Sequence, residues 1–171
     1  MKTISIGHTN ETPLGKIWVA MNEKGLVAVA YPAVQADFEA RLMRQRRMEV
    51  QFAPEKVKDA LEQLQQYAAG ERREFTIPID WSVLNEFQQR ALKITFGIPY
   101  GETRTYKEIA IELGNPRAAR AVGRAEATNP MPVVIPCHRV VGSDSKMHGY
   151  GAGEGISTKV WLLEHEKAIM G

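Results

Sequence analysis

The chemistry that this sequence could perform centres on its only cysteine, Cys137. Cys137 lies in the run Pro136-Cys137-His138-Arg139, so an imidazole and a guanidinium follow the thiol directly. A free cysteine has a pKa of about 8.5, which leaves only a few per cent of it as thiolate at neutral pH. A base or a positive charge close to the sulfur would therefore make Cys137 a nucleophile, and His138 and Arg139 are the adjacent candidates.

A further group that could act on this imidazole lies near the C-terminal end. The run Lys159-Val160-Trp161-Leu162-Leu163-Glu164-His165-Glu166 predicts a helix. Either Glu166 or His165 could orient His138, as the third group of a nucleophile, base and orienter arrangement. A lone cysteine can instead be a small buried hydrophobic residue, and composition alone favours that interpretation over catalysis.

A basic helix is predicted upstream of the cysteine, over 117–125. Arg117, Arg120 and Arg124 have the spacing i, i+3 and i+7, which places them on one helix face, and alanine and glycine fill most positions between them. Within 104–139, six Arg and Lys stand against three Glu. An arginine stripe of this kind attracts phosphates, whereas the alternative is a solvated basic stripe over an alanine-packed core.

A second helix is predicted immediately before the basic one. Thr105 and Glu108 match a capping box at its start, and Gly114-Asn115-Pro116 ends it. Two short helices joined by a glycine-containing turn are typical of a helix-turn-helix.

Composition excludes several classes of protein. Of the 171 residues 44% are hydrophobic, and the formal net charge of +2 is small, so a disordered chain is not expected. The longest apolar runs fall short of the roughly 20 residues that span a bilayer, and the first residues show no apolar signal core. A single cysteine excludes an intramolecular disulfide and a zinc site built on several thiolates. We therefore expect a soluble, cytoplasmic protein without a membrane segment or a metal site.

The hydrophobic pattern divides the chain into two expected domains, 1–84 and 85–171, and the fold class is α+β. The first domain is expected to begin with an antiparallel meander and the second to be mostly helical. In the first domain we expect strands at 3–8, 15–21, 25–31 and 75–79, and helices at 36–48 and 54–69. In the second we expect helices at 85–96, 105–113, 117–125 and 159–166, and a buried apolar strand that leads into Pro136.

Read as a whole, the sequence around Cys137 resembles the active-site signature of the O6-alkylguanine-DNA alkyltransferases, also called methylated-DNA–protein-cysteine methyltransferases. The resemblance covers residues 85–167, about half of the chain, with the motifs in the same order throughout. The motifs are Phe87-Gln88, Ile98-Pro99-Tyr100-Gly101, Tyr106, Asn115-Pro116-Arg117-Ala118-Ala119-Arg120-Ala121-Val122-Gly123, Asn129-Pro130, Pro136-Cys137-His138-Arg139-Val140, Gly149-Tyr150 and Lys159-Val160-Trp161-Leu162-Leu163-Glu164-His165-Glu166.

For the fold, the resemblance implies a small N-terminal α/β domain of the ribonuclease-H-like type. It also implies a mostly helical C-terminal domain with a winged helix-turn-helix-like DNA-binding unit. For the activity, it implies direct-reversal DNA repair, in which an alkyl group moves irreversibly from O6-alkylguanine in DNA to Cys137. O4-alkylthymine is a second candidate substrate. Such a methylated-DNA-[protein]-cysteine S-methyltransferase acts once per molecule and requires no cofactor.

The resemblance also implies catalytic roles for five residues. Cys137 would be the thiolate that accepts the alkyl group. His138 would activate it through a water, Glu166 would orient the imidazole, and Asn129 would fix the active-site turn. Tyr106 would supply a proton to the guanine as the bond to its O6 breaks.

For the partner, the resemblance implies double-stranded DNA bound through its minor groove by a monomer, with the alkylated guanine flipped out of the stack. Arg120 would fill the space that the base leaves, and Arg117 and Arg124 would contact phosphates. The small residues expected to allow close approach of the helix are Ala119, Ala121 and Gly123. The residues expected to line the guanine pocket are Met131, Pro132, Val140, Tyr150 and Gly151.

Two other functions remain open at this point. One is a non-catalytic DNA-binding protein that recognises alkylguanine, which Cys137 disfavours because such relatives have another residue at the nucleophile position. The other is a Cys-His hydrolase, which would need a separate oxyanion hole and would leave the arginine and alanine helix unexplained.

Overall fold

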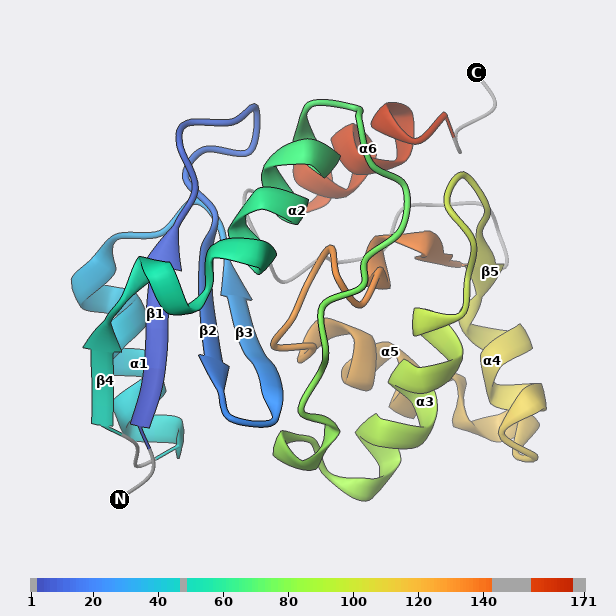
Figure 1. Cartoon of the computed structure of the whole chain (residues 1–171). Helices are drawn as coiled ribbons and strands as arrows, with labels where there is room; N and C mark the ends of the chain where they lie inside the picture. The colour runs from blue at the N-terminus through green and yellow to red at the C-terminus, as the bar shows by residue number, and fades with distance from the viewer. Residues whose placement is uncertain (1–2, 47–48, 143–154, 168–171) are drawn as a thin grey trace. The chain divides into compact units, whose positions relative to one another are not determined.

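The computed structural model describes residues 3–46, 49–142 and 155–167. The chain folds into two compact units, Met1–Trp81 and Ser82–Gly171 (Figure 1). The α+β fold class expected from the sequence is confirmed, since one unit contains a small sheet and the other is mostly helical. The domain boundary expected between residues 84 and 85 stays a prediction. Among the described residues, no helix has the length and apolar character needed to cross a membrane.

The N-terminal unit is built on a four-stranded sheet with the order β3-β2-β1-β4. The strands are β1 (Thr3–His8), β2 (Trp18–Asn22), β3 (Gly25–Ala30) and β4 (Glu49–Phe52). The first three form the antiparallel meander that the alternating pattern predicts, with Ile6 paired to Ala20 and Val19 paired to Val29. Ile4 and Ile6 are fully buried, so the sheet forms the core of this unit.

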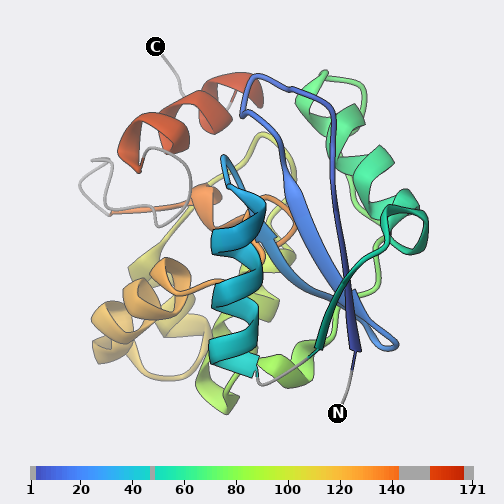
Figure 2. The ribbon, with the colours of Figure 1, turned by 90° about the vertical axis from the view of Figure 1, so that its left-hand side faces the viewer.

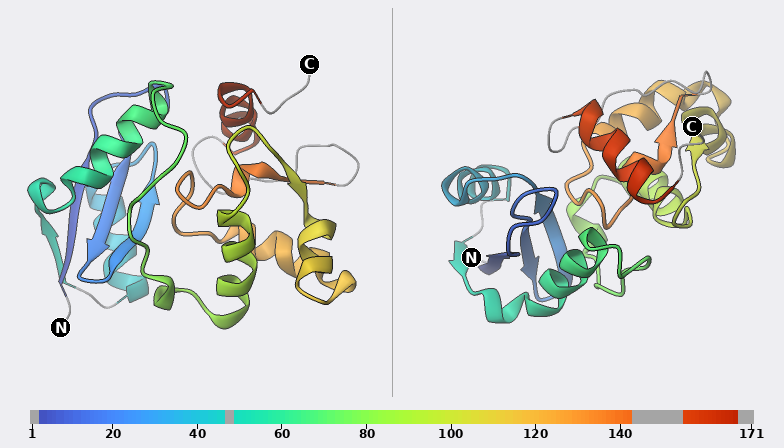
Figure 3. Two further views of the ribbon diagram at one scale, coloured as in Figure 1. Left: turned by 45° about the vertical axis from the view of Figure 1, so that its right-hand side comes forward. Right: turned by 90° about the horizontal axis from the view of Figure 1, so that it is seen from above.

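Helices cover both faces of this sheet. The first is α1 (Gln35–Arg46), and the second is α2 (Lys58–Ala68), preceded by the short 3-10 helix η1 (Pro54–Lys56). Figures 2 and 3 show α1 against one face and α2 against the other. The side chains of Leu64 and Tyr67 on α2 are fully buried, as expected for an apolar helix stripe.

One strand of this unit was not predicted, and the prediction of a strand at 75–79 was wrong. Strand β4 pairs in parallel with β1, but its residues are mostly exposed, so a short edge strand leaves little hydrophobic pattern in the sequence. Segment 75–79 is not a strand and makes only one bridge, between Ile79 and Leu26. Pro78 has no backbone N–H to donate to a sheet ladder, although its carbonyl accepts from the Leu26 amide at 2.8 Å.

The C-terminal unit is mostly helical, as expected. Its α-helices are α3 (Glu86–Phe96), α4 (Tyr106–Glu112), α5 (Ala119–Ala127) and α6 (Ile156–His165). Two short strands, β5 (Arg104–Thr105) and β6 (Val140–Val141), pair in parallel. The 3-10 helices η3 (Pro116–Ala118) and η4 (Cys137–Arg139) precede α5 and β6 (Figure 3).

Capping residues define where α3 and α4 begin. Asn85 accepts from the Gln88 amide and Thr105 accepts from the Glu108 amide, and both caps are complete capping boxes. A buried cluster that includes Ile109 on α4 and Val122 on α5 holds the two helices together. The helix-turn-helix arrangement therefore has its own apolar core.

Two expectations for this unit need correction. The expected single helix over 117–125 is divided, because Asn115 caps the 3-10 turn η3, which holds Arg117, and α5 begins only at Ala119. The segment before Pro136 is buried but is not a strand. It turns back on itself, with a single bridge between Pro132 and Ile135, and its prolines remove donors that a ladder needs.

A test of this fold concerns Gly25, at the start of β3. Its φ is +143°, and a Cβ there would lie 2.5 Å from the Pro78 carbonyl oxygen. We expect Gly25→Ala to lower the free energy of unfolding by at least about 2 kcal/mol in urea titrations. Exposed Gly97 is the control, because its added Cβ would meet nothing closer than 3.4 Å and Gly97→Ala should change stability by only about 0.5 kcal/mol. Equal effects of the two substitutions would contradict the assigned strain.

Candidate active site

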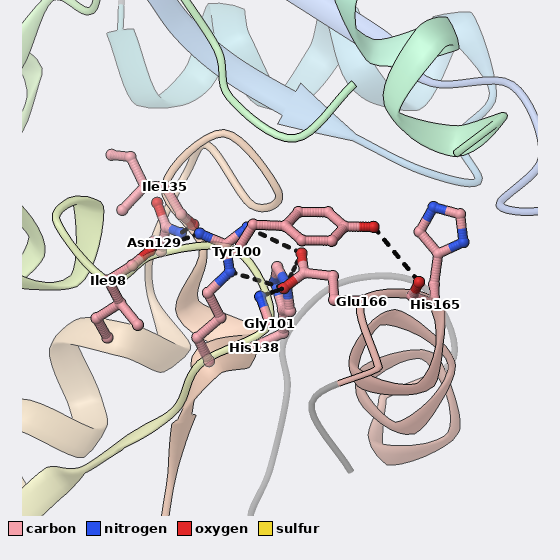
Figure 4. A network of polar contacts seen from close by, with 9 residues as sticks. Ile98, Tyr100, Gly101, Asn129, Ile135, His138, His165 and Glu166 are labelled. Carbon is pink, nitrogen blue, oxygen red and sulfur yellow. Dashed lines mark hydrogen bonds and ion pairs between the residues drawn. The ribbon is translucent and has the colours of Figure 1, made fainter. Parts of the chain in front are cut away.

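The turn before the cysteine is held by the side chain of Asn129. Its Nδ2 donates to the Ile135 carbonyl at 2.9 Å (Figure 4). Its Oδ1 accepts from the Met131 amide at 2.9 Å. Within this turn Val133 has a φ of +74°, which is unfavourable for a β-branched residue. Asn129 thus ties both ends of a strained loop, and this loop leads directly into Cys137.

Cys137 begins the 3-10 helix η4 and is 6% exposed. Burial raises the pKa of its thiol to about 12, and the charge of Glu126 adds to this shift. A hydrogen bond with the Asn129 side chain and the charge of Lys159 act in the opposite direction. In the resting protein Cys137 is therefore a thiol at neutral pH, and it needs a base to become a nucleophile.

The imidazole of His138 is fully buried and is oriented by Glu166. The distance from His138 Nε2 to Glu166 Oε2 is 2.8 Å. Because an ionised carboxylate can only accept, Nε2 carries the proton and donates it to this bond. The other ring nitrogen, Nδ1, is buried and has no hydrogen-bond partner among the described residues. Burial lowers the pKa of His138, so the neutral imidazole presents Nδ1 as an acceptor.

Glu166 is in turn held by Arg139 through two bonds. Arg139 Nε donates to Oε1 at 2.8 Å, and a terminal nitrogen, Nη2, donates to Oε2 at 2.9 Å. Burial alone would raise the pKa of Glu166, but the bonds from His138 and Arg139 hold it well below its usual range. The carboxylate is therefore ionised at neutral pH, and its charge is compensated by the guanidinium.

The loop Ile98–Gly101 closes around this ion pair. The Ile98 carbonyl accepts from Arg139 Nη1 at 2.6 Å, and the Tyr100 ring lies 5.7 Å from the guanidinium carbon. The Gly101 amide donates to Glu166 Oε1 at 3.4 Å, and Gly101 has a φ of +83°, which favours glycine. This segment therefore supplies acceptors and donors to the buried charges (Figure 4).

A second group of ionisable side chains surrounds the cysteine. Burial raises the pKa of Tyr106, at the start of α4, to about 12, so its phenol keeps its proton. Lys159 on α6 is 1% exposed, and its Nζ donates to the Val140 carbonyl at 2.8 Å and to the Tyr106 hydroxyl at 3.4 Å. Glu126 on α5 is buried as well, and its carboxyl oxygen Oε1 accepts from the Thr95 hydroxyl.

The structure brings the five residues expected to be catalytic into one unit. Of the two expected orienting groups, Glu166 contacts His138, whereas the His165 ring stacks on Trp161 with centroids 4.6 Å apart.

The three arginines Arg117, Arg120 and Arg124 are exposed, and Ala119, Ala121 and Gly123 are half-buried. Met131, Pro132 and Val140 are buried close to Cys137 in the chain. Tyr150 and Gly151 lie outside the described residues.

Three residues of the site are not fully predictable from the sequence. The pattern indicates Arg139 only as a charge adjacent to the thiol, whereas it binds Glu166. It predicts no role for Lys159 and Glu126, because a charged residue in a helical pattern is normally solvent-exposed. A signal is available for Lys159, since it lies in a motif of the resemblance, but none is available for Glu126.

The fold and this site can be compared with known protein families. A helix-turn-helix unit with exposed arginines carries a buried cysteine beside a base held by an ion pair. The chain matches the model described as 6-O-methylguanine DNA methyltransferase, ribonuclease-like domain, over residues 6–81. It matches the model described as 6-O-methylguanine DNA methyltransferase, DNA binding domain, over residues 86–168.

Individual relatives agree with these matches. The methylated-DNA–protein-cysteine methyltransferase of Methanosarcina barkeri is 41% identical, over 92% of this chain and 94% of that protein. The constitutive enzyme of that name from Bacillus subtilis is 38% identical, over 93% of each. Among solved structures, Mycobacterium tuberculosis OGT in complex with DNA has a TM-score of 0.76 at 35% identity, covering 97% of this chain and 93% of that one. The chain therefore belongs to the 6-O-methylguanine DNA methyltransferase family.

A stability test addresses the buried ion pair. We expect Arg139→Met to lower the free energy of unfolding by about 3–5 kcal/mol, because it leaves the buried carboxylate of Glu166 without its countercharge. The control is Arg104→Met, which removes an ion pair to Glu112 whose side chains are 31% and 50% exposed and should change stability by less than about 1 kcal/mol. Urea unfolding at pH 7 measures both. A loss at Arg139 no larger than that at Arg104 would contradict the role given to this pair.

Proposed function

We propose that this chain repairs alkylated DNA by moving an alkyl group from O6 of guanine to the sulfur of Cys137. One observation carries this proposal: the buried thiol follows a fixed turn and precedes a neutral imidazole whose Nδ1 has no partner among the described residues. Membership of the 6-O-methylguanine DNA methyltransferase family supports it. The names of the relatives specify transfer from methylated DNA to a protein cysteine.

The first step is deprotonation of the thiol. Because burial raises the pKa of Cys137 to about 12, few molecules hold a thiolate without a base. His138 takes the proton at Nδ1 through a bridging water, while its Nε2–H bond to Glu166 at 2.8 Å keeps the ring in place. Glu166 stabilises the imidazolium that forms, and Arg139 keeps Glu166 ionised.

The second step forms a carbon–sulfur bond and breaks the bond between the same carbon and O6. The electron pair of the broken bond passes to the guanine, which takes a proton from the Tyr106 phenol. Lys159, whose Nζ lies 3.4 Å from the Tyr106 hydroxyl, stabilises the resulting tyrosinate. The proton held by His138 then returns to Tyr106 through solvent, so the net change moves one proton from Cys137 to guanine.

The product thioether makes each molecule act once. A thioether is a poor leaving group, and none of the residues assigned to the site has a role in removing the alkyl group. The reaction is therefore stoichiometric in protein, with Cys137 consumed.

The DNA-binding part of the proposal rests on α5 and η3. We assign double-stranded DNA as the partner, bound by a monomer through the minor groove, with Arg120 filling the place of a flipped guanine. Arg117 and Arg124 contact phosphates, and the half-buried Ala119, Ala121 and Gly123 allow close approach. A Cβ added at Gly123 would have the Tyr106 ring as its nearest neighbour, at 3.9 Å. Helix α5, which is proposed to bind DNA, therefore lies next to Tyr106, the proposed proton donor.

The base pocket is assigned to residues that adjoin Cys137. Met131 and Val140 are fully buried, and Pro132 is buried beside Met131 in the chain. Tyr150 and Gly151 are also assigned to the pocket, and they lie outside the described residues.

The proposal is tested by intact-protein mass spectrometry after incubation with a duplex oligonucleotide that contains O6-methylguanine. We expect at most one added methyl group, a gain of about 14 Da, located on Cys137 by peptide mapping, because a thioether is not turned over. Cys137→Ser should gain no mass. Catalytic release of product without a mass gain would indicate a hydrolase, and binding without transfer would indicate a non-catalytic recognition protein.

A second test separates base flipping from chemistry. Arg120→Ala should slow repair of duplex DNA by about tenfold or more while leaving the reaction with free O6-benzylguanine within about twofold, because the free base needs no flipping. Arg124→Ala is the matched control, and it should weaken DNA binding and reduce its salt dependence without this substrate difference. Equal losses of Arg120→Ala on both substrates would mean that Arg120 serves the pocket or the fold.

A further inference from the structure

Glu126 is a buried acid that the reaction steps above leave without a role. Glu126 is 5% exposed and lies on the inner face of α5. The same helix carries Arg120 and Arg124 on its exposed face. The Thr95 hydroxyl, from α3, donates to Glu126 Oε1. The second oxygen, Oε2, is buried and has no hydrogen-bond partner among the described residues.

Three other ionisable groups interact electrostatically with this carboxyl, each from a different element. They are Tyr106 on α4, Cys137 on η4 and Lys159 on α6, and electrostatic interactions connect Glu126 to all of them. Of these side chains only Lys159 can carry a positive charge; burial lowers its pKa, whereas the charges of Cys137 and Glu126 act in the opposite direction. A buried site with one ammonium group favours one anion and opposes a second, because charges in a low-dielectric interior repel strongly.

The directions of the pKa shifts agree with this count of charges. Burial raises the pKa of Glu126 to about 8, against the opposing effects of the Thr95 bond and Lys159. The charge of Glu126 in turn raises the pKa of both Cys137 and Tyr106, in addition to burial. Glu126 and Cys137 therefore compete for the same countercharge.

We propose that Glu126 is a positioning residue that sets the upper pH limit of alkyl transfer. As a neutral acid it permits the thiolate of Cys137 beside Lys159, and as a carboxylate it opposes that thiolate. This inference rests on the proposed function, because it concerns the rate at which Cys137 takes up the alkyl group.

The sign of the effect follows from the two protonation states. Below about pH 8 Glu126 is mostly protonated, so replacing it with the neutral isostere glutamine changes little. Above that pH the wild-type carboxylate raises the pKa of Cys137, and Glu126→Gln removes this effect. The rate ratio of variant to wild type should therefore rise with pH.

The experiment measures single-turnover methyl transfer from O6-methylguanine duplex DNA between about pH 6 and pH 9. We expect Glu126→Gln to match wild type within about twofold at pH 6 and to be about tenfold faster at pH 9, which corresponds to roughly one unit in the thiol pKa. Thr95→Val removes a bond that favours the Glu126 carboxylate, so this carboxylate should form at higher pH than in wild type. The inhibition of methyl transfer by the carboxylate should therefore also begin at higher pH. This second variant keeps the carboxyl in place.

Reaction of Cys137 with iodoacetamide over the same pH range separates failure of this inference from failure of the proposed function. The same rising ratio is expected, because the reagent also reports thiolate and needs no DNA. A ratio that is constant with pH for both reagents would overturn the role of Glu126. No methyl transfer by wild type, together with a rising iodoacetamide ratio, would overturn the proposed function but not the charge competition.

Discussion

The buried ion pair between Glu166 and Arg139 is the interaction on which the rest of the site depends. Two bonds, of 2.8 and 2.9 Å, join the groups, and burying either charge alone would be strongly unfavourable. The pair joins the end of α6 to η4 and to the Ile98 carbonyl. It also fixes the proton on His138 Nε2 and leaves Nδ1 as the acceptor. Packing, charge balance and the choice of tautomer therefore follow from one contact.

Two buried polar networks with different properties meet at Cys137. The first, His138 with Glu166 and Arg139, keeps a fixed distribution of charge because the pKa of Glu166 is well below its usual range. The second, Tyr106 with Lys159 and Glu126, contains a carboxyl whose pKa is raised to about 8. We propose that the first network supplies a base, and that the second supplies a proton donor and an electrostatic limit on the thiolate. Both are proposed to act on the same sulfur.

Local signals predicted much of this structure, whereas long-range contacts were not predictable. The cap at Thr105 was recognisable because its capping box with Glu108 lies within four residues. The apolar run before Pro136 correctly indicated burial, but its backbone path depends on prolines and on the Asn129 bonds. The choice between Glu166 and His165 depends on which side of α6 packs inward. The burial of Glu126 was hidden because its partners come from four other elements.

The most direct test of this account is nitrogen-15 NMR of the His138 imidazole in the resting protein, assigned with a His138→Phe variant. We predict a neutral ring protonated at Nε2 at about pH 6.5, where an ordinary imidazole is half protonated, because burial lowers its pKa and Arg139 already compensates Glu166. A ring protonated at Nδ1, or an imidazolium at this pH, would leave no acceptor for the thiol proton and would contradict the account.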